Sequence, residues 1–286
     1  MPAYGKRRAL GQHFLKDRMI CNLIAQTAVE QAHLHGCVAL LEIGPGKGAI
    51  TEPLLGLLKR QKQIESFQLV ERDRDLAAFW KSRLSSQDES LPSISLMTLE
   101  ADFVELPATE WLKSSPIAVV SNLPYSAGTA ITTGLARHTR EIPVMVLMFQ
   151  AEVAQRLRAE PSTKSWGSLS VWIQNQWEVK KLTSVPPRAF SPPPEVDSEV
   201  VVFTRRDRPL VHVENTPAAQ AQWESLLKAC FAHRRKMLRA GLAGTPFKAA
   251  LDRSGIDPTL RAEALSWEHW AAFWQSVNSN SPEKQD

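Results

Sequence analysis

The run Asn122-Leu123-Pro124-Tyr125 has the residue types needed to hold a base by its amino group. It follows the apolar, β-branched stretch 117–120, which is typical of a buried strand. In open α/β sheets, ligands bind just beyond the carboxyl ends of such strands. The Asn122 amide and the Leu123 carbonyl are neighbouring acceptors, and the following proline fixes the angle of that carbonyl, while the Tyr125 ring offers a stacking platform. Asparagine and proline also end strands in ordinary turns, so the run by itself is equally consistent with a turn.

The elements that would position this run begin with a glycine turn, Glu42–Gly48. An apolar stretch, 38–43, precedes the turn and a helical pattern, 49–60, follows it. Strand, glycine turn and helix in this order open nucleotide-binding α/β domains. Gly44 and Gly46 would let a ligand approach the backbone closely, because glycine has no side chain to block it.

Acidic residues follow the next two predicted strands. Glu71 ends the strand 67–70, at the distance beyond the glycines where such folds place a carboxylate on ribose hydroxyls. Asp102 follows the strand 94–99 and can accept the amino group of an adenine, with the neighbouring Phe103 packing on its ring. A single acid of this kind is usually a surface residue. Acids or acceptors at the ends of four consecutive strands indicate a nucleoside site.

Composition restricts the class of protein. The chain has 286 residues, 43% of them hydrophobic, and no apolar run of membrane-spanning length. Its first ten residues are polar and basic, without the apolar stretch of a secretory signal. Three cysteines without a C-x-x-C pair argue against a disulfide scaffold or a zinc site. We therefore expect a cytoplasmic protein that binds neither membrane nor metal.

The net charge of +4 conceals two basic segments, 1–18 and 228–239, on a chain that is otherwise acidic. Basic segments on an acidic body fit the binding of a polyanion at defined places, although solvated surface charge gives the same pattern. The candidate phosphate contacts are Lys6, Arg7, Arg8, Arg234, Arg235 and Lys236.

The second half of the chain changes character after Arg206. Before it, β-rich runs at 176–182 and 196–204 flank a proline-rich stretch, 185–194, which predicts a stiff extended loop. After it, the patterns are helical, at 218–239, 246–254 and 267–274. We expect two domains, one at 1–206 and a small helical one at 207–286.

Taken together, these motifs resemble the small-subunit (16S) ribosomal RNA adenine N6,N6-dimethyltransferase family. The resemblance runs nearly from end to end. It is carried by Gly11-Gln12-His13-Phe14-Leu15, the turn Glu42–Gly48, the run Asn122–Tyr125, the proline-rich stretch 185–198, Arg234-Arg235-Lys236 and Gly255-Ile256-Asp257-Pro258. It implies a seven-stranded, Rossmann-like, S-adenosylmethionine-dependent methyltransferase sheet with one reversed edge strand, followed by an all-helical, RNA-binding C-terminal domain.

The resemblance also implies roles for individual residues. The cofactor S-adenosylmethionine would contact His13, Leu15, Gly44, Gly46, Glu71, Asp102 and Asn122. The target adenine would be held by Asn122, Leu123, Pro124 and Tyr125, with Phe190 stacking on its other face. The chain departs from the usual family residues at His13, Ala151, Trp166, Glu195 and His233.

The implied activity is dimethylation of N6 on adjacent adenines in a hairpin loop near the 3′ end of small-subunit ribosomal RNA. The substrate would be presented in a pre-ribosomal particle, to a monomeric enzyme without metal. One alternative is a dimethyltransferase of large-subunit ribosomal RNA, and another is a non-catalytic RNA-binding assembly or transcription factor on the same fold. A nicotinamide enzyme would account for the glycines and Glu71, but for nothing after them.

Overall fold

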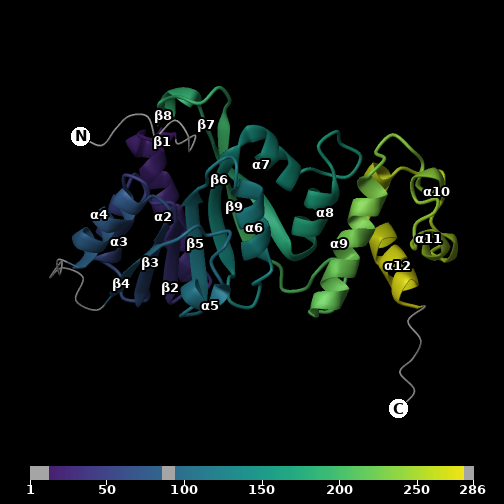
Figure 1. The fold of residues 1–286 in the computed structure, drawn as a ribbon, viewed down its shortest axis with the longest axis horizontal. Coiled ribbons are helices and arrows are strands. Elements are labelled where there is room, and N and C mark those ends of the chain that lie inside the picture. The colour runs from purple at the N-terminus through teal and green to yellow at the C-terminus, as the bar shows by residue number, and fades with distance from the viewer. Residues whose placement is uncertain (1–12, 86–93, 280–286) are drawn as a thin grey trace, which may run out of the picture. The chain divides into compact units, whose positions relative to one another are not determined.

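The computed structural model describes residues 13–85 and 94–279 (Figure 1). Contacts divide the chain into two compact units. The first contains the residues up to Ala154 together with Glu178–Arg205, and the second contains Gln155–Trp177 and the residues from Arg206 onward. The expected boundary at 206 coincides with the last junction between the units. The segment 155–177, which we expected in the first domain, lies in the second because Trp166 and other apolar side chains of it belong to the helical core.

A seven-stranded sheet forms the centre of the first unit, in the order β4-β3-β2-β5-β6-β9-β7. The strands are β2 (Ala39–Ile43), β3 (Ser66–Glu71), β4 (Ser95–Glu100), β5 (Ile117–Asn122), β6 (Val144–Gln150), β7 (Trp177–Val185) and β9 (Ser198–Arg205). The five strands from β4 to β6 are parallel, and β9 runs antiparallel to β6. The reversed strand is therefore inside the sheet and not at its edge, because β9 returns from the proline-rich loop and inserts between β6 and β7.

Parallel strands buried on both faces need helices to cover them, and the first unit supplies these between its strands. They are α2 (Arg18–Leu34), α3 (Thr51–Leu58), α4 (Arg74–Ser85), α5 (Ala108–Trp111), α6 (Gly128–Ala136) and the start of α7 (Ala151–Leu157). Helix α2 packs on β5, β6 and α3, and α4 packs on β3 and β4. The carboxyl ends of β2, β3, β4 and β5 therefore lie along one edge of the sheet (Figure 1).

The N-terminal segment is tied to the proline-rich loop. The apolar spacing of residues 13–30 predicts a helix there. The helix begins only at Arg18, because the Asp17 carboxylate caps it by accepting the amides of Met19 and Ile20 at 3.0 and 3.3 Å. The preceding β1 (Phe14–Leu15) pairs antiparallel with β8 (Phe190–Ser191). The proline-rich stretch is thus extended only in part, since it contains the short 3₁₀ helix η1 (Pro187–Ala189) and then β8.

The second unit is helical, as expected for its C-terminal part. Its elements are α8 (Ser168–Gln176), α9 (Pro217–Phe231), α10 (Leu238–Gly241), α11 (Lys248–Arg253), the 3₁₀ helix η2 (Ala262–Ala264) and α12 (Trp267–Asn278). Its core is rich in tryptophan, with Trp166, Trp223 and Trp270 almost fully buried. Helix α9 ends at Phe231 and not at 239, so the basic residues 234–236 lie in the turn that follows it.

No helix in residues 13–85 and 94–279 is both long and apolar enough to cross a membrane. The same residues contain no cluster of three or more His, Cys, Asp or Glu side chains arranged to hold a metal ion. The three cysteines are buried and unpaired, and burial raises the pKa of Cys37 and Cys230 to about 12.

Candidate active site

A cavity of about 310 Å³ lies at the carboxyl ends of the parallel strands in the first unit. It is lined by every residue expected to hold the cofactor, namely His13, Leu15, Gly44, Gly46, Glu71, Asp102 and Asn122. Leu123, Pro124 and Tyr125 line it as well. The tertiary structure therefore brings together both sets of residues that the sequence indicated, with Phe190 as the exception.

The glycine turn has a backbone conformation in which residues other than glycine would be strained. Gly44, Gly46 and Gly48 have φ values of 68°, 54° and 87°, in the left-handed region. A Cβ atom on Gly48 would lie 2.5 Å from the ring of Trp80, and the indole nitrogen of Trp80 donates to the Gly46 carbonyl at 2.8 Å. Trp80, on α4, is thus a structural support of the turn that the sequence analysis missed, because nothing in its local pattern distinguishes it from an ordinary core residue.

Glu71 fixes the other side of this turn. The residue is 4% exposed, and its carboxylate accepts hydrogen bonds from the backbone amides of Gly46 at 3.0 Å and Asp73 at 2.9 Å. Burial raises the pKa of Glu71, and these amide hydrogen bonds oppose the rise. A carboxylate has about four acceptor positions, so Glu71 keeps capacity for ligand hydroxyls while it holds the turn in place.

Glu42 is a second buried acid that the sequence analysis did not select as a site residue. It is the last residue but one of β2, lines the cavity and is 2% exposed. Its Oε2 atom has no hydrogen-bond partner among the described residues. Burial raises the pKa of Glu42 to about 8. The signal that could have identified it is its place at the end of a buried strand directly before the glycine turn, where an acid is costly unless it has a partner.

Asp102 follows β4 and is held in place from two sides. Its Oδ1 accepts the amide of Val104 at 3.1 Å, and its Oδ2 pairs with Nη1 of Arg72 at 3.1 Å. Phe103, beside it, is 8% exposed and packs at a tilt on Trp111. Arg72 places a positive charge at this end of the cavity, which the sequence analysis did not anticipate.

The run from Asn122 to Tyr125 leaves the end of β5 at the cavity wall. The side-chain amide of Asn122 has no hydrogen-bond partner among the described side chains and backbone groups, so its side-chain oxygen is available to a ligand. The Tyr125 hydroxyl is hydrogen-bonded to the hydroxyl of Ser198 at 2.7 Å, which fixes the orientation of the ring. Burial raises the pKa of Tyr125.

The N-terminal segment closes one side of the same cavity. Nδ1 of His13 lies 2.9 Å from the carbonyl oxygen of Pro192, and the imidazole lies 5.7 Å from the Tyr125 ring, between centroids, at an angle of 31°. The neighbouring Phe14 ring has Nζ of Lys47 over its face, 4.6 Å from its centroid. His13 thus contacts the tyrosine of the predicted base pocket while lining the predicted cofactor cavity.

Phe190 does not lie where a stacking residue is needed. It is 1% exposed, packs in the core cluster of the first unit and does not line the cavity. Its backbone pairs with Leu15 across the two short strands β1 and β8. In this conformation a base cannot stack on the ring, because core side chains already surround it. These contacts instead make Phe190 an anchor that holds the proline-rich loop on the core of the first unit.

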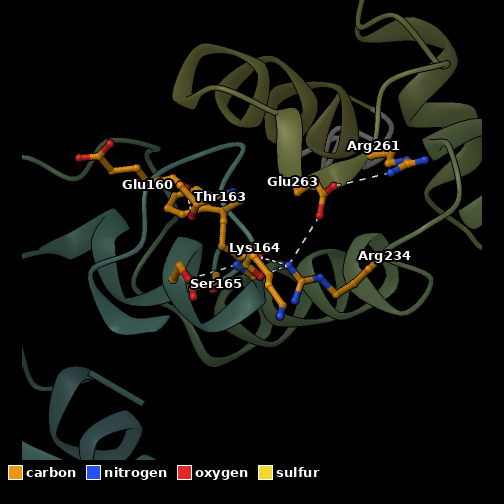
Figure 2. Close-up of polar contacts among 10 residues, drawn as sticks. Glu160, Thr163, Lys164, Ser165, Arg234, Arg261 and Glu263 are labelled. Atoms are coloured by element: carbon orange, nitrogen blue, oxygen red, sulfur yellow. Dashed lines mark hydrogen bonds and ion pairs between the residues drawn. The ribbon is translucent and has the colours of Figure 1, made fainter. Parts of the chain in front are cut away.

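The basic side chains predicted to contact RNA differ in whether they already have hydrogen-bond or ion-pair partners within the protein. Nη2 of Arg234 donates to the carbonyls of Lys164 and Trp166 at 2.7 and 2.8 Å and pairs with Glu263 at 3.6 Å (Figure 2). Arg234 therefore joins the segment 155–177 to the C-terminal helices, which leaves only its other guanidinium nitrogens for a phosphate. Within the described part of the chain, the exposed side chains of Arg235 and Lys236 have no such partners, whereas Lys6, Arg7 and Arg8 lie outside the described residues.

Comparison with known proteins decides the family. A sequence model of the family described as ribosomal RNA adenine dimethylase matches residues 4–279. The chain belongs to this family. This confirms the resemblance inferred from the motifs and leaves the nicotinamide interpretation without support.

Two relatives show how far the similarity extends. Ribosomal RNA small subunit methyltransferase A of Rhodospirillum rubrum is 37% identical over 283 residues, which cover 96% of this chain and 88% of the relative. The protein of the same name from Syntrophotalea carbinolica is 36% identical, with 95% and 96% of the two chains covered.

Solved structures support the fold. The 23S rRNA methyltransferase ErmE has a TM-score of 0.63 and 26% identity, and covers 93% of this chain and 99% of its own. A dimethyladenosine transferase from Plasmodium falciparum has a TM-score of 0.71 at 21% identity, covering 93% and 98%. The predicted fold class, a methyltransferase sheet with a helical C-terminal part, is confirmed.

Proposed function

We propose that this chain uses S-adenosylmethionine to dimethylate N6 of adjacent adenines in a hairpin near the 3′ end of small-subunit ribosomal RNA, within a pre-ribosomal particle. The observation that carries the proposal is one cavity that joins strand-end acids to the run Asn122–Tyr125. The names of the two bacterial relatives favour the small subunit over the large one.

The residues around the cavity fit this cofactor. The unpartnered Oε2 of Glu42 is a buried acceptor suited to a cationic group. A Cβ atom on Gly44 would meet nothing within 4 Å, so the backbone there is open to a close ligand. Glu71 would bind the ribose hydroxyls, Asp102 the adenine amino group, and His13 and Leu15 would enclose the methionine part. When bound, S-adenosylmethionine supplies a methyl group made electrophilic by its sulfonium.

The protein's own groups would position the nucleophile. The N6 lone pair of adenine is delocalised into the ring and is a weak nucleophile. The Asn122 oxygen and the Leu123 carbonyl would accept the two N6 hydrogens, which draws N6 toward a tetrahedral geometry and aims its lone pair. Positive charge then develops at N6 beside two fixed carbonyl dipoles, which stabilise it. Pro124 restricts the backbone angle of Leu123 and so fixes the direction of the Leu123 carbonyl. Tyr125 would stack on the extruded adenine, which offsets the stacking that the adenine loses when it leaves its neighbouring bases in RNA.

Phosphate binding is proposed for Arg235 and Lys236, together with Lys6, Arg7 and Arg8. For Arg234 the contacts favour a structural role in the second unit over direct RNA binding. A cytoplasmic site of action and a monomeric state are proposed on the same basis as the substrate, from membership of the family.

Mapping of N6-dimethyladenine in ribosomal RNA from cells with and without the gene tests the proposal. Loss of the modification near the 3′ end of small-subunit RNA, with rescue by the wild-type gene and not by Asn122→Ala, is the expected result. A change confined to large-subunit RNA would instead support the activity named for the similar ErmE structure. An unchanged pattern would support a non-catalytic RNA-binding role.

A further inference from the structure

Most of the charged side chains on the wall of the cavity already have partners within the protein. The carboxylates of Glu71 and Asp73 accept backbone amides, Glu71 from both sides of the turn and Asp73 at the start of α4. Asp102 is paired with Arg72 at 3.1 Å. These groups are held by the protein itself, whereas two charged side chains of the glycine turn are not.

The two are Glu42 and Lys47, which lie near opposite ends of the turn and both line the cavity. Oε2 of Glu42 is buried without a hydrogen-bond partner. Within residues 13–85 and 94–279, Nζ of Lys47 has neither an ion pair nor a hydrogen bond, so the two groups do not pair with each other. The wall of the cavity thus offers a ligand one buried carboxyl oxygen and one ammonium group.

The aromatic ring of Phe14 keeps Lys47 at the cavity. Nζ of Lys47 lies 4.6 Å from the centroid of this ring, which itself lines the cavity. A Cβ atom on Gly46 would lie 3.3 Å from the same ring, so Phe14 packs directly on the glycine turn. A cation–π contact holds the ammonium group in place but gives its N–H donors no oxygen acceptor.

A ligand with one ammonium and one carboxylate group matches these two charges. The methionine part of S-adenosylmethionine, an α-amino acid, has both. The cofactor also carries a positive charge on sulfur, so a lysine in its cavity would oppose binding unless the lysine meets the carboxylate. The sign of the effect of Lys47 on binding therefore reports what its ammonium group contacts.

We propose that Nζ of Lys47 binds the carboxylate of the methionine part of the cofactor, while Oε2 of Glu42 accepts its ammonium group. The inference rests on the proposed function, because it concerns the cofactor named there. It makes Lys47 a binding residue that selects cofactors with an intact amino-acid end.

Calorimetry with two related compounds and the full chain tests the proposal without RNA or methyl transfer. S-adenosylmethionine has the carboxylate and decarboxylated S-adenosylmethionine lacks it, whereas both have the ammonium and the sulfonium. Lys47→Met should weaken binding of S-adenosylmethionine by about 5- to 10-fold, between an exposed ion pair and a hydrogen bond to a charged group. Binding of the decarboxylated compound should be unchanged or tighter, because the variant has lost a like charge. Lys47→Arg keeps a cationic donor and should retain most of the affinity for S-adenosylmethionine.

Lys16→Met is the matched control. Lys16 is exposed, lies two residues after Phe14 in the same N-terminal segment and does not line the cavity. Its replacement should leave both affinities unchanged. A loss of S-adenosylmethionine affinity equal to that of Lys47→Met would show that the carboxylate needs no contact with Lys47, and would overturn the proposal. Melting curves of all three variants, whose substituted side chains are exposed, should match that of wild type.

The outcomes separate this proposal from the proposed function. If the wild-type chain does not bind S-adenosylmethionine, both fail. If wild type binds it and Lys47→Met binds it as tightly, or loses affinity for both compounds alike, only the role of Lys47 fails. Unchanged cofactor affinity with a lower salt dependence of RNA binding would assign Lys47 to a phosphate instead.

Discussion

Replacement of Glu42 by glutamine should change the pH dependence of stability in a direction that its burial dictates. Glu42 is 2% exposed, and burial raises the pKa of its carboxyl group from 4.5 to about 8. Between these values the unfolded chain loses this proton and the folded chain keeps it. The contribution of this proton to the free energy of unfolding is therefore present in full below pH 4.5 and is lost as the pH rises toward 8. Its slope is about 1.4 kcal/mol per pH unit, so the whole loss is at most about 5 kcal/mol.

Glutamine stays neutral at every pH, so Glu42→Gln should lack this loss. Urea unfolding at pH 5, 6, 7, 8 and 9 would give the free energy of unfolding of both proteins. The stability of the variant relative to wild type should rise with pH up to about 8 and then level off. A difference that is the same at all five values would show that Glu42 is not protonated in the folded protein, and would refute the argument from burial.

The same carboxyl should report cofactor binding. At pH 7 a group with a pKa of about 8 is about nine-tenths protonated, whereas a nearby cation favours the ionised form. Binding of S-adenosylmethionine at pH 7 should then release up to about 0.9 proton, measured by calorimetry in two buffers of different ionisation enthalpy. Glu42→Gln should abolish the release. Equal proton release from both proteins would place its source elsewhere.

Four further substitutions test individual contacts. Glu71→Ala should weaken cofactor binding in calorimetry and also lower the unfolding free energy of the apo-protein by about 1–3 kcal/mol, because the amides of Gly46 and Asp73 lose their acceptor; unaltered affinity would remove the ribose assignment. Arg234→Ala should destabilise the chain by about 1–2 kcal/mol in urea unfolding, since two carbonyls lose a donor. Arg235→Ala should instead leave stability unchanged and lower the slope of log RNA affinity against log salt by about 0.7–0.9, and a reversal of these two results would contradict the assignment. Phe190→Ala should cost about 3–5 kcal/mol of stability as a core truncation, whereas a raised RNA KM at unchanged stability would restore the stacking role.

The sequence alone determined the parts of the site that depend on local patterns. Each apolar strand pattern is followed in the sequence by a glycine turn, an acidic residue or another hydrogen-bond acceptor. Parallel strands bring their carboxyl ends to one edge of the sheet, so these residues are predicted to lie close together. For this reason Gly44, Gly46, Glu71, Asp102 and Asn122 could be selected before the structure was known, and all of them line one cavity. The same alternation of strands and helices indicated an α/β domain, whereas the seven-stranded methyltransferase sheet was implied by the family resemblance.

Only the tertiary structure decided how distant segments meet. His13 reaches Pro192 across 179 positions, and Trp80 supports the glycine turn from a helix whose local pattern gives no sign of it. Helical periodicity put the start of α2 at residue 13, but the pairing of β1 with β8 keeps residues 14 and 15 extended. Phe190 and Arg234 carry family motifs, yet their packing and hydrogen bonds place one in the core and the other between segments of the helical unit. Side-chain burial and long-range pairing depend on the whole packed chain, so a local pattern indicates which residue types are present without specifying which surface each one faces.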